Sequence, residues 1–183
     1  LKCFSKVSAA MLFSAIAEAM MVAFGTASSS ATLPLTIACC EKRGISHKIS
    51  SFVLPLGATL NFDGTALLQT VAVIFLAQAY QVHLTPFLVV QIAVLAIIAS
   101  STCAGIPGGG LITIALILNG MGLSPELLVA GFAFLFTIER LTDMFRTTLN
   151  ITSDAVVAAT IADNENEINY DLLNNPAAYE EIA

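Results

Sequence analysis

The stretch "ISSFVLPLGATLNFDGTALLQTVAVIFLAQAY", residues 49–80, is long and apolar enough to cross a bilayer, but "NFDGT", residues 61–65, interrupts it near the middle. A spanning helix needs about 20 apolar residues, and a break inside one frees backbone groups that hydrocarbon cannot satisfy. Such breaks are tolerated only where they face protein or a polar cavity. The stretch therefore predicts a broken transmembrane helix over about 46–80, with the break as a candidate binding site.

The composition favours the same environment. The 183 residues are 57% hydrophobic and 11% charged, with a mean hydropathy of +0.86, whereas soluble domains carry about 25% charged residues. No Asp, Glu, Lys or Arg occurs between Gly64 and Pro125. We therefore expect an integral, multi-pass protein of the plasma (inner) membrane, with the lipid bilayer as its surroundings.

Charge is concentrated in two kinds of segment. Residues 163–183 hold six of the 13 acidic residues and none of the 7 basic ones, which predicts a solvated, flexible, acidic tail. The neutral body and acidic tail argue against a nucleic-acid partner. The positive-inside rule places the clustered basic residues in the cytoplasm, and we expect the tail there too. These residues are Lys2, Lys6, Lys42, Arg43 and Lys48.

Two runs of small residues, "ASSSATLP" at 27–34 and "AGIPGGG" at 104–110, lie between apolar segments that are too short to cross a bilayer alone. Two half-length helices joined at a small tip form a re-entrant hairpin. We therefore expect hairpin 1 over about 11–43 and hairpin 2 over about 86–118, entering from opposite sides. The plainer interpretation is that both runs merely connect ordinary helices.

Paired interrupted segments that meet at mid-membrane are typical of the binding site of a secondary transporter. Half-helix N-termini attract anionic groups, and broken backbone offers carbonyl oxygens to cations. The sequence contains no Ser/His/Asp set, phosphate-binding loop or metal cluster. We therefore expect a transporter rather than an enzyme, and no cofactor.

The last apolar segment, expected as a helix over about 125–162, carries most of the charge of the membrane body. At about 100° per residue its polar side chains fall within roughly 60° of Asp143. One charge at the bilayer centre costs at least about 2.5 kcal/mol, so such a stripe needs partners. A buried ion-pair network is one interpretation. The mixture of side chains favours a site, because Asp suits an ammonium, Arg a carboxylate and Asn or Asp a hard cation. The stripe comprises Glu139, Asp143, Arg146, Thr147, Asn150 and Asp154.

Four motifs, "TASSSATLP", "LPLGATLNFDGTAL", "AGIPGGG" and "DMFRTTLNITSDA", follow one another in this order. Together they resemble the sodium-coupled glutamate/aspartate and neutral amino-acid transporters, the dicarboxylate/amino acid:cation symporters. The resemblance covers the chain up to the acidic tail. It implies an all-α membrane protein, namely an elevator-type transport domain of two opposed re-entrant hairpins, a broken helix and a long last helix. It also implies Na⁺ as the coupling ion, scaffold segments N-terminal to this sequence, and a homotrimer of the full-length protein.

The resemblance also implies site residues by position. An amino-acid site would be lined by Ser28, Ser29, Thr65, Ile106, Gly110, Asp143, Arg146, Thr147 and Asn150. One sodium site would comprise Gly57, Asn61, Asn150 and Asp154, a second Thr59, Ser100, Ser101 and Cys103, and a third would include Asn61 and Asp63.

The sequence departs from the family pattern at several of these motifs. Phe62 stands where Met is usual, Cys103 where Thr or Ala is common, and Glu139 where Asp is frequent. Neither Ala27 nor Met144 supplies the Arg that relatives place at the first tip or on the last helix, and Arg140 is the nearest substitute.

The expected function is sodium-driven symport of glutamate or aspartate, with this chain as the binding core. One alternative is a proton-coupled carrier of C4-dicarboxylates. Asp143 argues against it, because a ligand without an ammonium would leave a buried carboxylate unpaired. The other alternative is a truncated binding or assembly module that holds an amino acid without moving it.

Overall fold

The fold is built from helices. The computed structural model describes residues 5–102, 109–120 and 125–174, and within these ranges it holds helices and one isolated bridge between Ile45 and Ile168. The expected all-α fold class is confirmed for this part of the chain. The helices are α1 (Ala9–Thr26), α2 (Ser29–Lys42), α3 (His47–Leu60), α4 (Asp63–Ala79), α5 (Pro86–Ser100), α6 (Gly109–Gly120), α7 (Pro125–Asn164) and α8 (Tyr170–Asn174).

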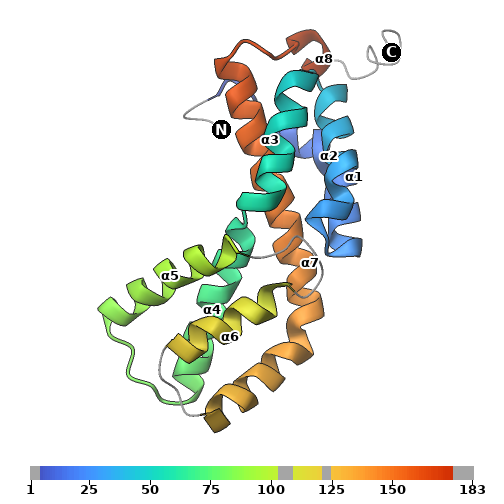
Figure 1. Cartoon of the computed structure of the whole chain (residues 1–183). Coiled ribbons are helices and arrows are strands. Elements are labelled where there is room, and N and C mark those ends of the chain that lie inside the picture. Colours follow the sequence, from blue (N-terminus) through green and yellow to red (C-terminus); the bar gives the residue numbers. More distant parts are fainter. Residues whose placement is uncertain (1–4, 103–108, 121–124, 175–183) are drawn as a thin grey trace.

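A two-residue turn joins α1 to α2. Ala27 adopts a left-handed conformation with φ of 51°, and its N–H bonds the carbonyl of Ala23, which closes α1. Ser28 then caps α2, because its hydroxyl accepts a hydrogen bond from the N–H of Ala31 at 3.2 Å. The two helices pack against each other as a helical hairpin with small polar residues at its tip (Figure 1).

The broken helix is present. α3 ends at Leu60 and α4 begins at Asp63, so Asn61 and Phe62 form the interruption. Asn61 is extended, with φ of −98° and ψ of 95°. The N–H of Asn61 bonds the carbonyl of Gly57 at 2.7 Å, and the N–H of Ala66 bonds that of Phe62 at 2.9 Å. The last carbonyls of α3 and the first N–H groups of α4 therefore meet at one point of the fold.

Two apolar cores lie on either side of this break (Figure 1). The first core joins α1, α2, α3 and the C-terminal half of α7, with Ile16, Leu54 and Ala155 among its buried members. The second joins α4, α5, α6 and the N-terminal half of α7, with Val73 and Ile92 at its centre. The 40-residue helix α7 runs through both cores and connects them.

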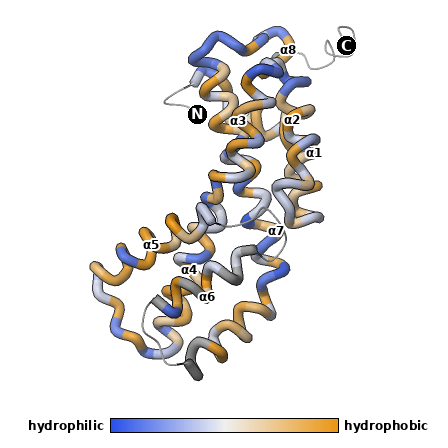
Figure 2. Tube along the Cα trace, in the orientation of Figure 1, coloured by the Kyte–Doolittle hydropathy of each residue, from blue (hydrophilic) through white to orange (hydrophobic). Residues whose placement is uncertain are grey.

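Helix lengths and surface composition agree with a membrane environment. Two apolar stretches of described helix are long enough to cross a bilayer, Ala9–Thr26 with 18 residues and His47–Ala79 with 33. α5 has 15 residues, too few to cross unaided. Large apolar side chains remain exposed along α3, α5 and α7, such as Phe52 at 69%, Phe87 at 79% and Val129 at 71%. Figure 2 shows how hydrophobic residues dominate much of these helices.

Residues 165–174, which follow α7, are folded, whereas the sequence predicts a flexible tail from residue 163 onward. They pair with the loop between α2 and α3: the N–H of Ser46 bonds the carbonyl of Glu167, and the N–H of Asn169 bonds that of Gly44. Lys48 adds an ion pair with Glu167 at 2.9 Å. We call residues 165–174 and this loop the C-terminal clasp. Composition alone missed it, because its anchors are a few buried apolar side chains, Leu172 and Leu173 among them.

Candidate functional site

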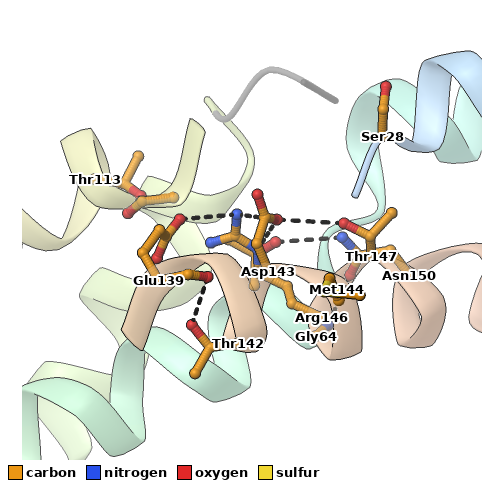
Figure 3. A network of polar contacts seen from close by, with 12 residues as sticks. Ser28, Gly64, Thr113, Glu139, Thr142, Asp143, Met144, Arg146, Thr147 and Asn150 are labelled. Carbon is orange, nitrogen blue, oxygen red and sulfur yellow. Dashed lines mark hydrogen bonds and ion pairs between the residues drawn. The ribbon is translucent and has the colours of Figure 1, made fainter. Parts of the chain in front are cut away.

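Buried polar side chains gather between the two cores, on one face of α7 (Figure 3). Asp143, Arg146, Thr147 and Asn150 are 2–5% exposed. The spacing of three and four residues that predicted a stripe places them side by side along the helix. The face looks toward the break between α3 and α4 and toward the start of α6.

Arg146 lies between two carboxylates of its own helix, an arrangement we call the arginine cluster. Its Nη2 is 2.5 Å from Asp143 Oδ1 and 3.4 Å from Glu139 Oε1. Its Nε donates a second hydrogen bond to Asp143 Oδ1 at 3.1 Å, and the Thr147 hydroxyl donates a third at 3.3 Å. The guanidinium is therefore held in one orientation by neighbours one and two turns along α7.

The remaining nitrogen of Arg146 faces the first turn of α6. Nη1 is buried and has no hydrogen-bond partner among the described residues. A Cβ atom added at Gly110 would overlap Nη1, so glycine is the residue that lets α6 approach the guanidinium this closely. A helix N-terminus and a guanidinium both favour anions, so this point is suited to a carboxylate.

Asn150 ties α7 to the break. Its Oδ1 accepts a hydrogen bond from the N–H of Gly64 at 2.8 Å, and its Nδ2 donates one to the Thr65 hydroxyl at 3.3 Å. A Cβ atom at Gly64 would lie 2.6 Å from the carbonyl oxygen of Arg146, so α4 begins in close contact with α7. The amide therefore satisfies the first turn of α4 and fixes the broken helix to the last one.

One turn further along α7, Asp154 forms a second group, which we call the aspartate cluster. Asp154 is 3% exposed, and its Oδ1 accepts a hydrogen bond from Asn61 Nδ2 at 2.7 Å. The same amide nitrogen also donates to the Ser153 hydroxyl at 2.6 Å. A Cβ atom at Gly57 would lie 2.5 Å from Asp154 Oδ1. In the part of the chain that the structure describes, no basic side chain lies within ion-pair distance of Asp154.

The tip of the α1–α2 hairpin is also buried. Ser28 and Ser29 are 8% and 3% exposed. Arg140 reaches toward this tip rather than into the arginine cluster, since its Nη2 lies 3.5 Å from the carbonyl oxygen of Gly25. Phe145 of α7 also contacts the end of α1, because its ring packs edge-on against Phe24 with ring centroids 5.2 Å apart.

The chain is similar to known transporters over most of its length. The model of the sodium:dicarboxylate symporter family matches residues 1–164, which include helices α1 to α7 and both clusters. The chain belongs to that family. It is 42% identical over 145 residues to an excitatory amino acid transporter of Caenorhabditis elegans, covering 79% of this chain and 28% of that protein. It is 41% identical over 150 residues to human excitatory amino acid transporter 2, covering 81% of this chain and 25% of that protein.

Human excitatory amino acid transporter 5 is similar to the same degree, 40% identical over 148 residues, with 80% of this chain and 26% of that protein covered. The chain thus spans less than a third of the length of these relatives. The sodium:dicarboxylate symporter family consists of transporters, so the chain is part of an integral membrane protein and its family is not one of enzymes.

The structure brings together most residues that the family resemblance named, but not all. Those near the two clusters are Gly57, Asn61, Thr65, Gly110, Asp143, Arg146, Thr147, Asn150 and Asp154. The hydroxyls of Thr59, Ser100 and Ser101 bond carbonyls of their own helices instead, and no hydrogen bond in the described ranges joins Thr59 to either serine. Asp63 is exposed. Ile106 and Cys103 lie outside the described residues.

Sequence reasoning did not assign a role to two further buried polar residues of this region. Gln69 on α4 and Thr113 on α6 are 0% and 3% exposed, and Gln69 Nε2 donates a hydrogen bond to Thr113 Oγ1. The spacing in the sequence could have indicated them, because Gln69 lies four residues after Thr65 and Thr113 three residues after Gly110. Each therefore shares a helix face with a residue that the resemblance named.

Proposed function

We propose that the protein containing this chain is a sodium-coupled symporter of acidic amino acids, and that the chain supplies its substrate and ion sites. The observation that carries this proposal is the buried Arg146 guanidinium. Two of its nitrogens are held by carboxylates of α7, and the third, Nη1, faces the first turn of α6 without a protein partner among the described residues.

The charges of the arginine cluster suit a zwitterion. With Glu139 and Asp143 ionised, two carboxylates face one guanidinium, which leaves room for one more positive charge. An amino-acid ammonium beside Asp143 would supply it, since an ionised carboxylate can only accept hydrogen bonds. The side-chain carboxylate of the substrate would then bind Arg146 Nη1. The other carboxylate would bind Asn150 and the tip residues Ser28 and Ser29. Aspartate and glutamate carry this set of groups.

The aspartate cluster suits sodium as the coupling ion. A buried carboxylate without a basic partner is costly, and a small cation with oxygen ligands would compensate it. Asp154 and Asn61 offer side-chain oxygens at the point where α3 ends and leaves carbonyl groups free of helix partners. Gly57 brings the α3 backbone up against the Asp154 carboxylate.

The proposal includes an arrangement in the membrane. The α1–α2 and α5–α6 pairs would be re-entrant hairpins that enter from opposite sides, because α2, α5 and α6 are too short to cross a bilayer unaided and the first turn of α6 lies against the arginine cluster (Figure 1). The whole would move as an elevator-type transport domain of a homotrimer in the plasma membrane. The ion pair of Glu167 with Lys48 supports a cytoplasmic tail, because it joins the tail to a basic loop.

Calorimetric titration of the full-length protein with aspartate would test the substrate and the ion together. Affinity should rise steeply with sodium chloride at constant ionic strength. Equal affinity in choline chloride and sodium chloride would refute sodium coupling. Tighter binding of succinate than of aspartate would instead favour a dicarboxylate carrier. Uptake of labelled aspartate by proteoliposomes under an inward sodium gradient would separate a carrier from a module that only binds.

Arg146→Cys tests the assignment of the substrate side chain. Leaving the side-chain carboxylate without its partner should weaken aspartate binding by at least about a hundredfold. Serine and alanine should still bind, because they have no second carboxylate. Arg140→Cys is the matched control, since Arg140 is exposed on the same helix and lies outside the arginine cluster. Aspartate binding within a few-fold of the unmodified protein in Arg146→Cys would show that Arg146 does not hold that carboxylate.

A further inference from the structure

A polar pair lies on two helices of the apolar second core. Gln69 on α4 is fully buried and comes four residues before Val73, and Thr113 on α6 is 3% exposed and directly precedes Ile114. Burying an amide or a hydroxyl among apolar side chains is costly unless hydrogen bonds compensate it. Two apolar residues of the same size would pack here without that cost. The pair therefore calls for an explanation beyond packing.

The hydrogen bonds of the pair have a defined direction. The Thr113 hydroxyl has one proton, and it donates that proton to the carbonyl of Gly110 at 2.8 Å. Its oxygen can then only accept, and Gln69 Nε2 donates to it. The bonds thus run from α4 through Thr113 to the first turn of α6. A carboxylate in place of the amide would have no proton to offer, so glutamine rather than glutamate fits this position.

The end of this chain of hydrogen bonds is the point where α6 meets the arginine cluster. Gly110 approaches the Arg146 guanidinium so closely that a Cβ atom would overlap it. A shift of the first turn of α6 away from α4 would therefore change the space available to Nη1, the nitrogen without a protein partner among the described residues. Gln69 and Thr113 fix that turn by joining it to α4, through a residue on the same face of α6 as Gly110.

We propose that Gln69 and Thr113 form a latch that positions the first turn of α6 against Arg146 and so sets the preference for acidic over neutral amino acids. The inference rests on the proposed function, because it assigns Arg146 Nη1 to the side-chain carboxylate of the substrate. Both are positioning residues: they act through Gly110 and do not contact the substrate. Neutral amino acids make no use of Nη1, so their binding does not depend on the latch.

Substitutions at Thr113 test the latch in the full-length protein, with aspartate and serine titrated in sodium chloride. Thr113→Val keeps the shape and removes the hydroxyl, and it should lower the ratio of aspartate to serine affinity at least about fivefold. Thr113→Ser keeps the hydroxyl and should restore the ratio to within about twofold. Thr70→Val is the control, because among the described residues the Thr70 hydroxyl bonds the carbonyl of Ala66 in its own helix and no other group.

A second variant guards against a merely structural effect. Gln69→Met should lower the same ratio, and combining it with Thr113→Val should add little, because either change already breaks the chain of hydrogen bonds. Equal losses of aspartate and serine affinity would overturn the latch and leave the proposed function standing, as would a ratio unchanged in Thr113→Val. An unmodified protein that binds no aspartate in sodium would refute the proposed function and this inference with it.

Discussion

The two polar clusters of α7 differ in how their charge is compensated. In the arginine cluster, Arg146 has two carboxylate partners from its own helix. In the aspartate cluster, the carboxylate of Asp154 faces the amide of Asn61 and the backbone of α3, and the described residues offer it no basic side chain. The first cluster comes almost wholly from one helix, whereas the second depends on where another helix breaks.

This difference suggests a division of roles. A cluster that contains both a guanidinium and carboxylates can replace contacts within the protein by contacts to a ligand that carries positive and negative charges. A lone buried carboxylate requires a cation instead. The first cluster is therefore suited to an amino acid and the second to the ion that would accompany it. Since both lie on one helix, a change in the position of α7 would affect the two sites together.

The largest expected effect is that of Asp143→Asn, which tests whether the arginine cluster binds a zwitterion. The amide would leave Arg146 with one carboxylate and the substrate ammonium with none. Breaking such a buried pair costs about 3–5 kcal/mol, so calorimetry should show amino-acid affinity lower by roughly two to four decades. Binding of dicarboxylates should be relatively spared. An equal loss for succinate and aspartate would contradict the assignment of Asp143 to the ammonium.

Asp154→Asn should have the next largest effect, and it tests the other side of the comparison. An amide cannot compensate the charge of a cation. The increase in aspartate affinity between low and high sodium concentration should therefore be smaller by about tenfold or more. The affinity extrapolated to saturating sodium should change far less. Asp171→Asn is the control, because Asp171 is an exposed residue of α8. If the sodium dependence of Asp154→Asn matched that of the control, Asp154 would not belong to the ion site.

Gly57→Ala should give a smaller effect at the same cluster. The new methyl group would lie 2.5 Å from Asp154 Oδ1, so the carboxylate or α3 must move by a few tenths of an ångström or more. Sodium affinity should fall by roughly tenfold, with aspartate affinity at saturating sodium nearly unchanged. Gly25→Ala is the matched control, because nothing lies within 4 Å of its added Cβ. Equal results for the two alanines would show that the close approach at Gly57 has no functional part.

Removing the exposed Lys48–Glu167 ion pair of the C-terminal clasp should have the smallest effect on stability. The buried-cluster variants can be compared with it. The Tyr170 hydroxyl and the backbone N–H of Lys6 lower the pKa of Asp163, and the ammonium of Lys48 lowers that of Glu167. Both carboxyls therefore contribute stability above their ordinary pKa near about 4, and the contribution is lost as the pH falls through the lower folded value.

Amide exchange of residues 165–174 should thus lose protection below about pH 4 before that of α7 does. Glu167→Gln should shift the melting temperature by no more than about 2 °C, as expected for an exposed pair. A shift as large as that of a buried-cluster variant would mean that the clasp is as important to the fold as the clusters.

The sequence allows part of this comparison to be predicted. Asn, Asp and Gly inside an apolar segment indicate the break at Asn61, and the recurrence of polar residues on α7 indicates one shared face. Both are local patterns of spacing. Family resemblance, rather than spacing, pointed to the partners of each residue across helices. The structure then adds which contacts exist, such as the orientation of Asn61 Nδ2 toward Asp154.

Other features could not be predicted because they depend on distant contacts. Gln69 reads as one polar residue in an apolar run until α6 brings Thr113 beside it. Arg140 shares α7 with the arginine cluster but turns toward the hairpin tip at Gly25. The acidic composition of the clasp predicts a flexible segment, but Leu172 and Leu173 bury their side chains. In each case the conformation depends on a contact between segments that are distant in the sequence. A local sequence pattern does not predict such a contact.

The clasp has a practical consequence for labelling the protein. Gly44 has φ of 88°, and a Cβ atom there would overlap the carbonyl oxygen of Asn169, so even alanine at that position would push the α2–α3 loop and the segment before α8 apart. A fluorophore attached at the α2–α3 loop would therefore also disturb the end of the last helix. A fluorescent protein or affinity tag is better fused after residue 174 than directly after α7, because a junction at Asn164 would remove the segment that covers the first core.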